Sequence, residues 1–147
     1  GNGGESVFLL EKKDKNFNQI VENFLNKSSE PFILQKFIPE VKKGDKRVLI
    51  VNGSPVAAVQ RIPKNNDIRS NIHVGGTVVK TKLTKNDLKI CDAIKEELIK
   101  NKLFFVGIDI IGNYLTEINV TSPTCIQEIK KLSKIDVSRK IWDELLV

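Results

Sequence analysis

The sequence has few of the residues on which several common kinds of site depend. Its 147 residues include two cysteines, Cys91 and Cys125, which are too few for a disulfide framework and lack the spacing of metal ligands. This usage is typical of the reducing cytoplasm, which is the compartment that we expect. The only histidine, His73, lies in a polar stretch, where we expect a solvated side chain rather than a catalytic base. No apolar run approaches the roughly 20 residues needed to cross a membrane, and no signal-peptide pattern is present.

The rest of the composition is typical of one globular domain, or of the larger part of a domain cut from a longer protein. Hydrophobic residues make up 40% and charged residues 29% of the chain. A formal net charge of +6 favours an anionic partner, which nucleic acid, a phosphate group or a carboxylate substrate would each satisfy. The few aromatic residues stand mostly at core spacing and no RNA-binding motif is present, which argues against a nucleic-acid interface.

Hydrophobic periodicity predicts an α+β fold, with a mostly antiparallel sheet and flanking helices. Helices are expected at about 15–27 after Asp14, from the capping box at Thr84 to about 101, at 123–132, and after Asp136. The second of these helices should bury Leu88, Cys91, Ile94 and Leu98.

Strands are expected at 7–10, 32–38, 46–51, 55–62, 103–111 and 114–120. Asn52-Gly53 is a strong signal for the turn of a hairpin between two of them. The polar segment 62–77 has no periodicity, and a loop of this length is typical of a functional lid.

Three polar residues, Asp109, Glu117 and Asn119, stand inside the apolar run VGIDIIGNYLTEINVTSPT at 106–124. Because side chains alternate faces along a strand, the three share one face if Asp109 pairs across from Glu117. That register needs a connection of three or five residues, so it excludes a two-residue turn at Gly112-Asn113. Two carboxylates and a carboxamide oxygen would then form a site for Mg²⁺. The alternative is that they are solvent-facing residues of a half-exposed hairpin.

The stretch GIDIIGNYLTEINVTSPT resembles the metal-binding end of the ATP-grasp ligases, and specifically of the bacterial type of glutathione synthetase. An acid followed by Glu-x-Asn is the general ATP-grasp pattern, whereas the continuation through residues 122–125 points to the glutathione synthetases. The resemblance extends over 1–129 and fades in the final helix. It implies that Asp109, Glu117 and Asn119 bind Mg²⁺, with Mn²⁺ as an alternative, against the ATP phosphates.

The same resemblance implies where ATP binds. Gly1, Gly3 and Gly4 match a small glycine loop whose backbone N–H groups fold over the β- and γ-phosphates, and successive glycine amides suit an anion. Asp45 matches the position that accepts hydrogen bonds from the ribose hydroxyls, and Arg47 matches a basic residue that faces the phosphates and the substrate. The adenine would bind a hinge made of Gln35, Lys36, Phe37 and Ile38.

Segment 62–77 resembles the family's large mobile loop, which closes over the active site. Arg61, Arg69 and Asn71 match positions that contact the substrate or the transferring phosphoryl group, and the planar fork of arginine suits both. Thr77 departs from the family pattern, which usually has another arginine there. The catalytic residues implied by the resemblance are Arg47, Arg61 and Arg69. The substrate-binding residues implied are Arg69, Asn71, the loop hinge Gly75 and Gly76, Ser122 and Thr124.

The resemblance implies that 1–147 is part of an ATP-grasp domain. Residues 1–38 would end its small subdomain, and residues 39–147 would form the C-terminal subdomain that binds ATP and Mg²⁺. The implied activity is the ATP-dependent ligation of glycine to γ-glutamylcysteine through an acyl phosphate, which makes glutathione. The implied enzyme binds neither nucleic acid nor membrane, and at full length it is commonly a homo-oligomer. Because the chain starts inside the glycine loop, we expect an inactive fragment, and glutathione formation by it would contradict this.

Three other readings remain open at this point. A different ATP-grasp ligase, such as a D-alanine–D-alanine ligase or an amino-acid ligase that modifies a protein terminus, would share the general pattern. A non-catalytic nucleotide-binding module would share the nucleotide site. A basic nucleic-acid-binding domain would share only the positive charge.

Overall fold

The computed structural model describes residues 7–27, 31–64 and 75–146. The chain divides into two compact units, Gly1–Ile38 and Pro39–Val147. This division falls where the sequence predicts a boundary between two subdomains, and the assignment of the units to those subdomains stays a prediction.

In residues 7–27 and 31–38 of the first unit, the structure has one helix, α1 (Phe17–Lys27), which begins two residues later than expected. Before it, Asp14 closes a turn by accepting a hydrogen bond from the Asn16 backbone N–H at 2.8 Å. On the helix, Phe24 lies 5.6 Å from both Phe8 and Phe32, measured between ring centroids. These aromatic contacts join the segments before and after the helix to α1.

The predictions of two strands in this unit are wrong. Residues 7–10 and 32–38 have no strand structure, and the segment expected to be buried exposes 82% of Ile33 and 76% of Leu34. A strand needs a neighbour for its backbone hydrogen bonds, and the described part of this unit supplies none. Runs of apolar residues alone could not reveal that missing partner.

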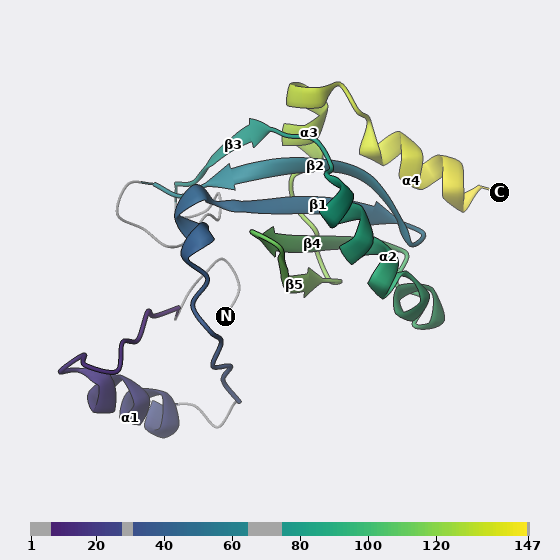
Figure 1. Cartoon of the computed structure of the whole chain (residues 1–147). Coiled ribbons are helices and arrows are strands. Elements are labelled where there is room, and N and C mark those ends of the chain that lie inside the picture. Colours follow the sequence, from purple (N-terminus) through teal and green to yellow (C-terminus); the bar gives the residue numbers. More distant parts are fainter. Residues whose placement is uncertain (1–6, 28–30, 65–74, 147) are drawn as a thin grey trace. The chain divides into compact units, whose positions relative to one another are not determined.

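The second unit is built on a five-stranded antiparallel sheet in the order β3-β2-β1-β4-β5 (Figure 1). A short 3-10 helix, η2 (Pro39–Lys43), leads into β1 (Asp45–Val51), which forms the predicted hairpin with β2 (Ser54–Ile62). Its turn is Asn52-Gly53, and both residues have positive φ angles, as this type of turn requires. The other strands are β3 (Thr77–Lys80), β4 (Phe105–Ile111) and β5 (Tyr114–Asn119). The sequence analysis missed β3, which has only four residues.

Helices cover both faces of this sheet (Figure 1). On one face lies α2 (Lys85–Lys100), opened by the predicted capping box between Thr84 and Asp87. On the other face lie α3 (Ile126–Ser133) and α4 (Val137–Leu145), the latter capped by Asp136 as expected. The α+β class with a mostly antiparallel sheet is confirmed. None of the helices in the described ranges is long and apolar enough to cross a membrane.

The start of α3 is a second correction. The sequence predicts a helix from Pro123, but α3 begins three residues later, at Ile126. Cys125, before it, has a left-handed backbone with φ of 83° and does not cap the helix through its side chain. Residues 121–124 therefore leave the sheet as irregular chain, which places Thr124 beside the strands.

The core has one layer on each side of the central strand β1, whose residues Val48 to Val51 are at most 1% exposed. The α2 layer contains Val48, Ile50, Ala58, Cys91, Leu98, Val106, Ile108 and Ile110. The layer under α3 and α4 contains Leu49, Val51, Ala57, Val59, Cys125, Ile129 and Val137. Leu88, predicted to be buried, is 41% exposed, whereas Cys91 and Leu98 are buried as expected.

Candidate functional site

The sheet face under α3 and α4 is apolar at one end and charged at the other. Alternation along β1 places Asp45 and Arg47 on the same face as Leu49 and Val51. Register then places Arg61 of β2 opposite Asp45, and Asp109 of β4 opposite Arg47. The exposed fractions of these four charged residues are between 3% and 8%.

These four side chains form one hydrogen-bonded network. Arg47 donates two hydrogen bonds to Asp109. Its Nε donates to Oδ1, and its Nη2 donates to Oδ2 at 2.9 Å. Arg61 donates to both carboxylate oxygens of Asp45, at 2.6 and 2.7 Å, and its Nη2 also donates to Asp109 Oδ2 at 2.6 Å. Buried carboxylates are costly unless they are paired and hydrogen-bonded. In this structure two arginines compensate Asp109, although its sequence neighbours are all apolar.

Gly107 allows this network to form on β4. A Cβ atom at Gly107 would lie 3.1 Å from Pro123 Cβ and 3.2 Å from Arg47 Cδ, which is closer than side chains normally approach. The absence of a side chain therefore lets Arg47 lie across the strand. Arg47 Nη1 then reaches Thr124 Oγ1, at 3.2 Å. The sequence analysis did not single out Gly107, although a glycine inside a strand pattern signals such a close approach.

The predicted pairing of Asp109 with Glu117 is confirmed, but the predicted turn is wrong. Gly112-Asn113 is a two-residue turn, which without correction would pair Glu117 with Ile108 and turn it to the α2 face. A β-bulge after Asp109 inserts one extra residue on β5 and restores the register. The extra residue is Thr116, whose hydroxyl donates to the Asp109 carbonyl at 3.1 Å. An odd-length connection was thus not the only way to bring the two acids together.

Asn119 completes the set of oxygen groups on this face. It lies opposite Gly107 on β5, two residues beyond Glu117. Its side-chain oxygen accepts a hydrogen bond from the Ser122 backbone N–H at 3.2 Å, which joins the irregular segment after β5 to the strand. Glu117 is exposed, whereas Asn119 is half-buried.

The carboxylates differ in their electrostatics. Burial would raise the pKa of Asp109, but hydrogen bonds from Arg47 and the charge of Arg61 outweigh it and hold the pKa below its usual range. Burial raises the pKa of Asp45, because the Arg61 interactions offset it only in part. Partial burial raises the pKa of the Glu117 carboxyl although the residue is exposed on one side, and the negative charge of Asp109 adds to the shift. Asp109 is therefore the strongest acid of the three.

The donor set fits a hard divalent cation such as Mg²⁺, which prefers oxygen ligands. An ionised carboxylate offers about four lone-pair positions, of which the arginines use three on Asp109. Among the residues that the structure describes, no other group takes the remaining position on Oδ1. The carboxylate of Glu117 and the carboxamide oxygen of Asn119 lie on the same face. Within 7–27, 31–64 and 75–146 no three His, Cys, Asp or Glu residues gather to hold a metal. The candidate set therefore consists of two carboxylates and one carboxamide.

The other predicted site residues lie in different places. Ser122 and Thr124 follow β5 and contact Asn119 and Arg47, as described above. Gly75 and Gly76 directly precede β3, and Gly75 has a φ angle of 90°. The predicted hinge residues Gln35, Lys36, Phe37 and Ile38 belong to the first unit. Gly1, Gly3, Gly4, Arg69, Asn71 and His73 lie outside the described residues.

Comparison with known proteins assigns the chain to a family. The family of the prokaryotic glutathione synthetase, ATP-grasp domain, matches residues 1–134. The chain belongs to this family. The glutathione synthetase of Agrobacterium fabrum is 48% identical over 145 residues, and that of Synechocystis sp. is 45% identical over 141 residues. The predicted resemblance and the ATP-grasp fold are thereby confirmed.

The chain spans about half the length of the relatives it matches. The match with the Agrobacterium fabrum protein covers 99% of this chain and 46% of that protein. For the glutathione synthetase of Mesorhizobium japonicum, which is 43% identical, the shares are 97% and 46%. The residues of the charged end, Asp45, Arg47, Arg61 and Asp109, all lie within the 1–134 that match the ATP-grasp domain family.

Proposed function

We propose that this chain binds ATP and Mg²⁺ for the ligation of glycine to γ-glutamylcysteine, the reaction that makes glutathione. The observation that carries the proposal is the convergence of Asp109, Glu117 and Asn119 with two arginines on one sheet face. The family match and the names of the relatives support the same reaction.

The chemistry needs an anion to attack another anion. The cysteinyl carboxylate of γ-glutamylcysteine attacks the γ-phosphorus of ATP, and ADP leaves as an acyl phosphate forms. The amine of glycine then attacks the acyl carbon, and inorganic phosphate leaves. Positive groups held in place before the reaction lower the barrier by stabilising the charge on the transferring phosphoryl group.

The arginines of the charged network suit this task. A guanidinium is a planar group that carries a positive charge, and Asp45 and Asp109 fix the planes of both arginines. Arg47 and Arg61 therefore hold their charge at the end of the sheet, where the oxygen ligands also gather. Arg69 and Asn71, in the segment 65–74, are proposed to contact the substrate.

Asp109, Glu117 and Asn119 are the residues that would hold Mg²⁺. When bound, the cation neutralises charge on the β- and γ-phosphates. Asp45 is proposed to accept from the ribose, and residues 35–38 to bind the adenine. Gly1, Gly3 and Gly4 are proposed to cover the phosphates. Gly75, Gly76, Ser122 and Thr124 are proposed to line the substrate side. The protein is proposed to act in the cytoplasm and, at full length, as a homo-oligomer.

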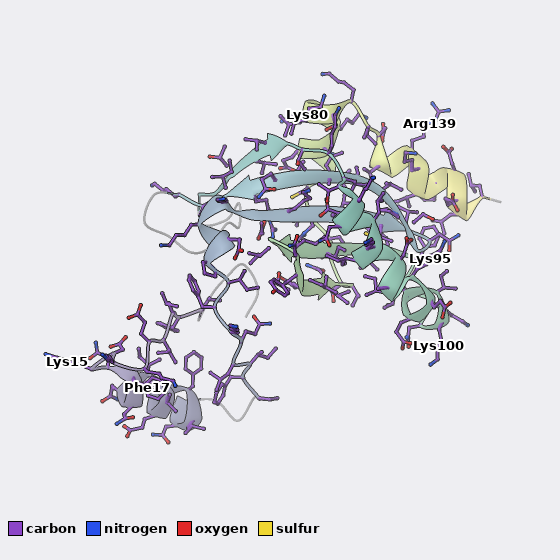
Figure 2. All side chains as sticks on the ribbon, viewed as in Figure 1. Lys15, Phe17, Lys80, Lys95, Lys100 and Arg139 are labelled. Atoms are coloured by element: carbon purple, nitrogen blue, oxygen red, sulfur yellow. The ribbon has the colours of Figure 1, made fainter. Side chains whose placement is uncertain are left out.

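A calorimetric titration with ATP, with and without Mg²⁺, tests the proposal. The unaltered chain should bind ATP in a metal-dependent manner, and the double variant Asp109→Asn, Glu117→Gln should lose that dependence. Arg139→Gln is a matched control, because Arg139 points away from the sheet and 81% of its side chain is exposed (Figure 2). Equal binding by the chain and the double variant would contradict the proposal.

A further inference from the structure

The two arginines that bind Asp109 are held very differently. Arg61 has two further hydrogen bonds to Asp45, so it keeps a full ionic partner if its bond to Asp109 breaks. Arg47 has both of its short bonds on Asp109, and its other contact is a longer one, 3.2 Å, to the hydroxyl of Thr124. Arg61 is thus anchored independently of Asp109, whereas Arg47 depends on it.

A cation at Asp109 competes with these arginines. Mg²⁺ approaches its oxygen ligands to about 2.0–2.1 Å and repels a guanidinium group nearby. Three of about four lone-pair positions on Asp109 already accept N–H groups. The remaining position is on Oδ1, which also accepts from Arg47 Nε, so a cation bound there repels the Arg47 guanidinium and weakens its contact.

We infer that cation binding at Asp109 releases Arg47, and not Arg61, so that the freed Arg47 guanidinium binds a phosphoryl oxygen. This inference rests on the proposed function, because it takes Asp109 as a ligand of the cation. Arg47 would serve two states in turn: it neutralises Asp109 before the cation arrives and neutralises phosphate afterwards. Arg61 remains on Asp45 in both states.

The surroundings of Arg47 suit such a release. Its side chain crosses Gly107, where no side chain of β4 stands in its path. The net charge of the site is small. Three acids, Asp45, Asp109 and Glu117, lie beside two arginines, Arg47 and Arg61, so the net charge that attracts a free dication is about −1. A nucleotide adds negative charge and therefore favours joint binding with the cation. The inference therefore predicts weak binding of the cation alone.

Binding of Mn²⁺ without nucleotide tests the competition directly. Electron paramagnetic resonance of free Mn²⁺ would give the affinity of the unaltered chain, of Arg47→Gln and of the matched control Arg139→Gln. Removal of the competing arginine should tighten Mn²⁺ binding by about fivefold or more, within the usual range of coupling between two ligands. Arg139→Gln should leave the affinity unchanged. Equal affinities for all three proteins would overturn the inference.

The variant Arg47→Lys separates competition for Asp109 from simple charge. Lysine keeps the positive charge but lacks the fork that binds both carboxylate oxygens. If Arg47 competes through its two bonds, Arg47→Lys should also tighten Mn²⁺ binding, although less than Arg47→Gln. An affinity equal to that of the unaltered chain would show that only charge matters and would contradict the release of Arg47. Far-ultraviolet circular dichroism confirms that each variant is folded, and Arg47→Lys keeps the charge that Asp109 needs.

The Nε–H resonances of the two arginines give a second measurement, which does not rely on activity. Addition of ATP with Mg²⁺ should shift the Arg47 signal and speed its exchange with solvent, while the Arg61 signal stays protected. The Arg47 signal is identified by its absence in Arg47→Gln. A shift of Arg61 instead, or of neither signal while ATP binds, would overturn the inference and leave the proposed function standing. No binding of ATP with Mg²⁺ would contradict the proposed function itself.

Discussion

The two faces of the sheet carry different buried side chains. The centre of the face under α2 is apolar, with Val48 and Ile50 from β1 and Val106, Ile108 and Ile110 from β4. The opposite face is apolar only under α3 and α4, and its other end carries two buried arginines and two buried carboxylates. The first face adds to stability without chemistry. On the second face, charged side chains replace part of the apolar contact, which is common at functional sites.

Charge also occurs on the α2 face, but only at its margin. Lys46 binds Asp87 at 2.6 Å and the Lys82 carbonyl at 3.2 Å, and Asp87 closes the capping box with Thr84. This pair joins the start of a helix to a strand. The Lys46–Asp87 pair thus fixes the start of α2 against the sheet. The network on the other face instead fixes the positions of charged groups that a ligand could contact.

The largest effect is expected from Arg61→Ala. This change leaves Asp45 and Asp109 buried with one partner fewer, and breaking a buried ion pair costs about 3–5 kcal/mol. Urea unfolding should show a loss of this size in the free energy of unfolding. The exposed Arg139→Ala should change it by less than about 0.5 kcal/mol. A loss below about 1 kcal/mol for Arg61→Ala would mean that the network contributes little to stability.

A change on the apolar face should separate stability from binding. Ile108 is fully buried, so Ile108→Ala should lower the free energy of unfolding by about 3 kcal/mol, through lost burial and a cavity. Because its side chain faces α2, the affinity for ATP with Mg²⁺ should remain within about twofold under conditions where the variant is folded. Calorimetry at low temperature measures that affinity. A loss of tenfold or more would show that the faces are not independent.

The Lys46–Asp87 pair predicts a smaller effect, which depends on pH. Burial would raise the pKa of Asp87, but hydrogen bonds from Lys46 and Thr84 lower it below the ordinary value of 3.8. A lowered pKa stabilises the fold above about pH 4, and this contribution disappears as the pH falls through the folded pKa. As the pH falls from about 4 to about 2, the free energy of unfolding should therefore decrease less for Asp87→Asn than for the unaltered chain.

The matched change for that pair is Thr84→Ala. It removes the hydroxyl that accepts from the Asp87 N–H and should cost about 1 kcal/mol at neutral pH. Denaturant unfolding at a series of pH values measures both variants. Identical pH profiles for Asp87→Asn and the unaltered chain would contradict the role of Asp87.

The smallest effect concerns the cysteines, of which each face buries one. Burial raises the pKa of Cys91 to about 11, and burial also raises the pKa of Cys125, so neither thiol is a good nucleophile. Iodoacetamide at pH 8 should label both slowly in the folded chain and rapidly in urea. Rapid labelling of Cys125 alone in the folded chain would show that the charged face is open to reagents near Thr124.

Much of the fold follows from local signals, because those signals involve residues close in sequence. The Asn52-Gly53 turn, the capping box at Thr84 and the cap at Asp136 each depend on a few neighbouring residues. The strand expected at 32–38 failed because pairing depends on a distant partner, which apolar composition does not reveal.

The candidate site shows the same division. Alternation along the strands predicted that Asp109 and Glu117 share a face, and their pairing was correct. The sequence analysis assigned Asp45, Arg47 and Arg61 to separate contacts. It did not foresee that Arg61 binds Asp45 or that both arginines bind Asp109. That network depends on register across β2, β1 and β4 and on Gly107, whereas the position of Glu117 beside it depends on the bulge at Thr116. Periodicity specifies none of these.

The most direct test of the account is to locate the cation. A crystal of this chain with a non-hydrolysable ATP analogue and Mn²⁺ would show the metal by its anomalous scattering. The account predicts one Mn²⁺ peak or more bounded by Asp109, Glu117 and Asn119, with the phosphates on its other side. A nucleotide bound with Mn²⁺ away from these three residues would contradict the central claim that the charged end of this sheet face is the metal site.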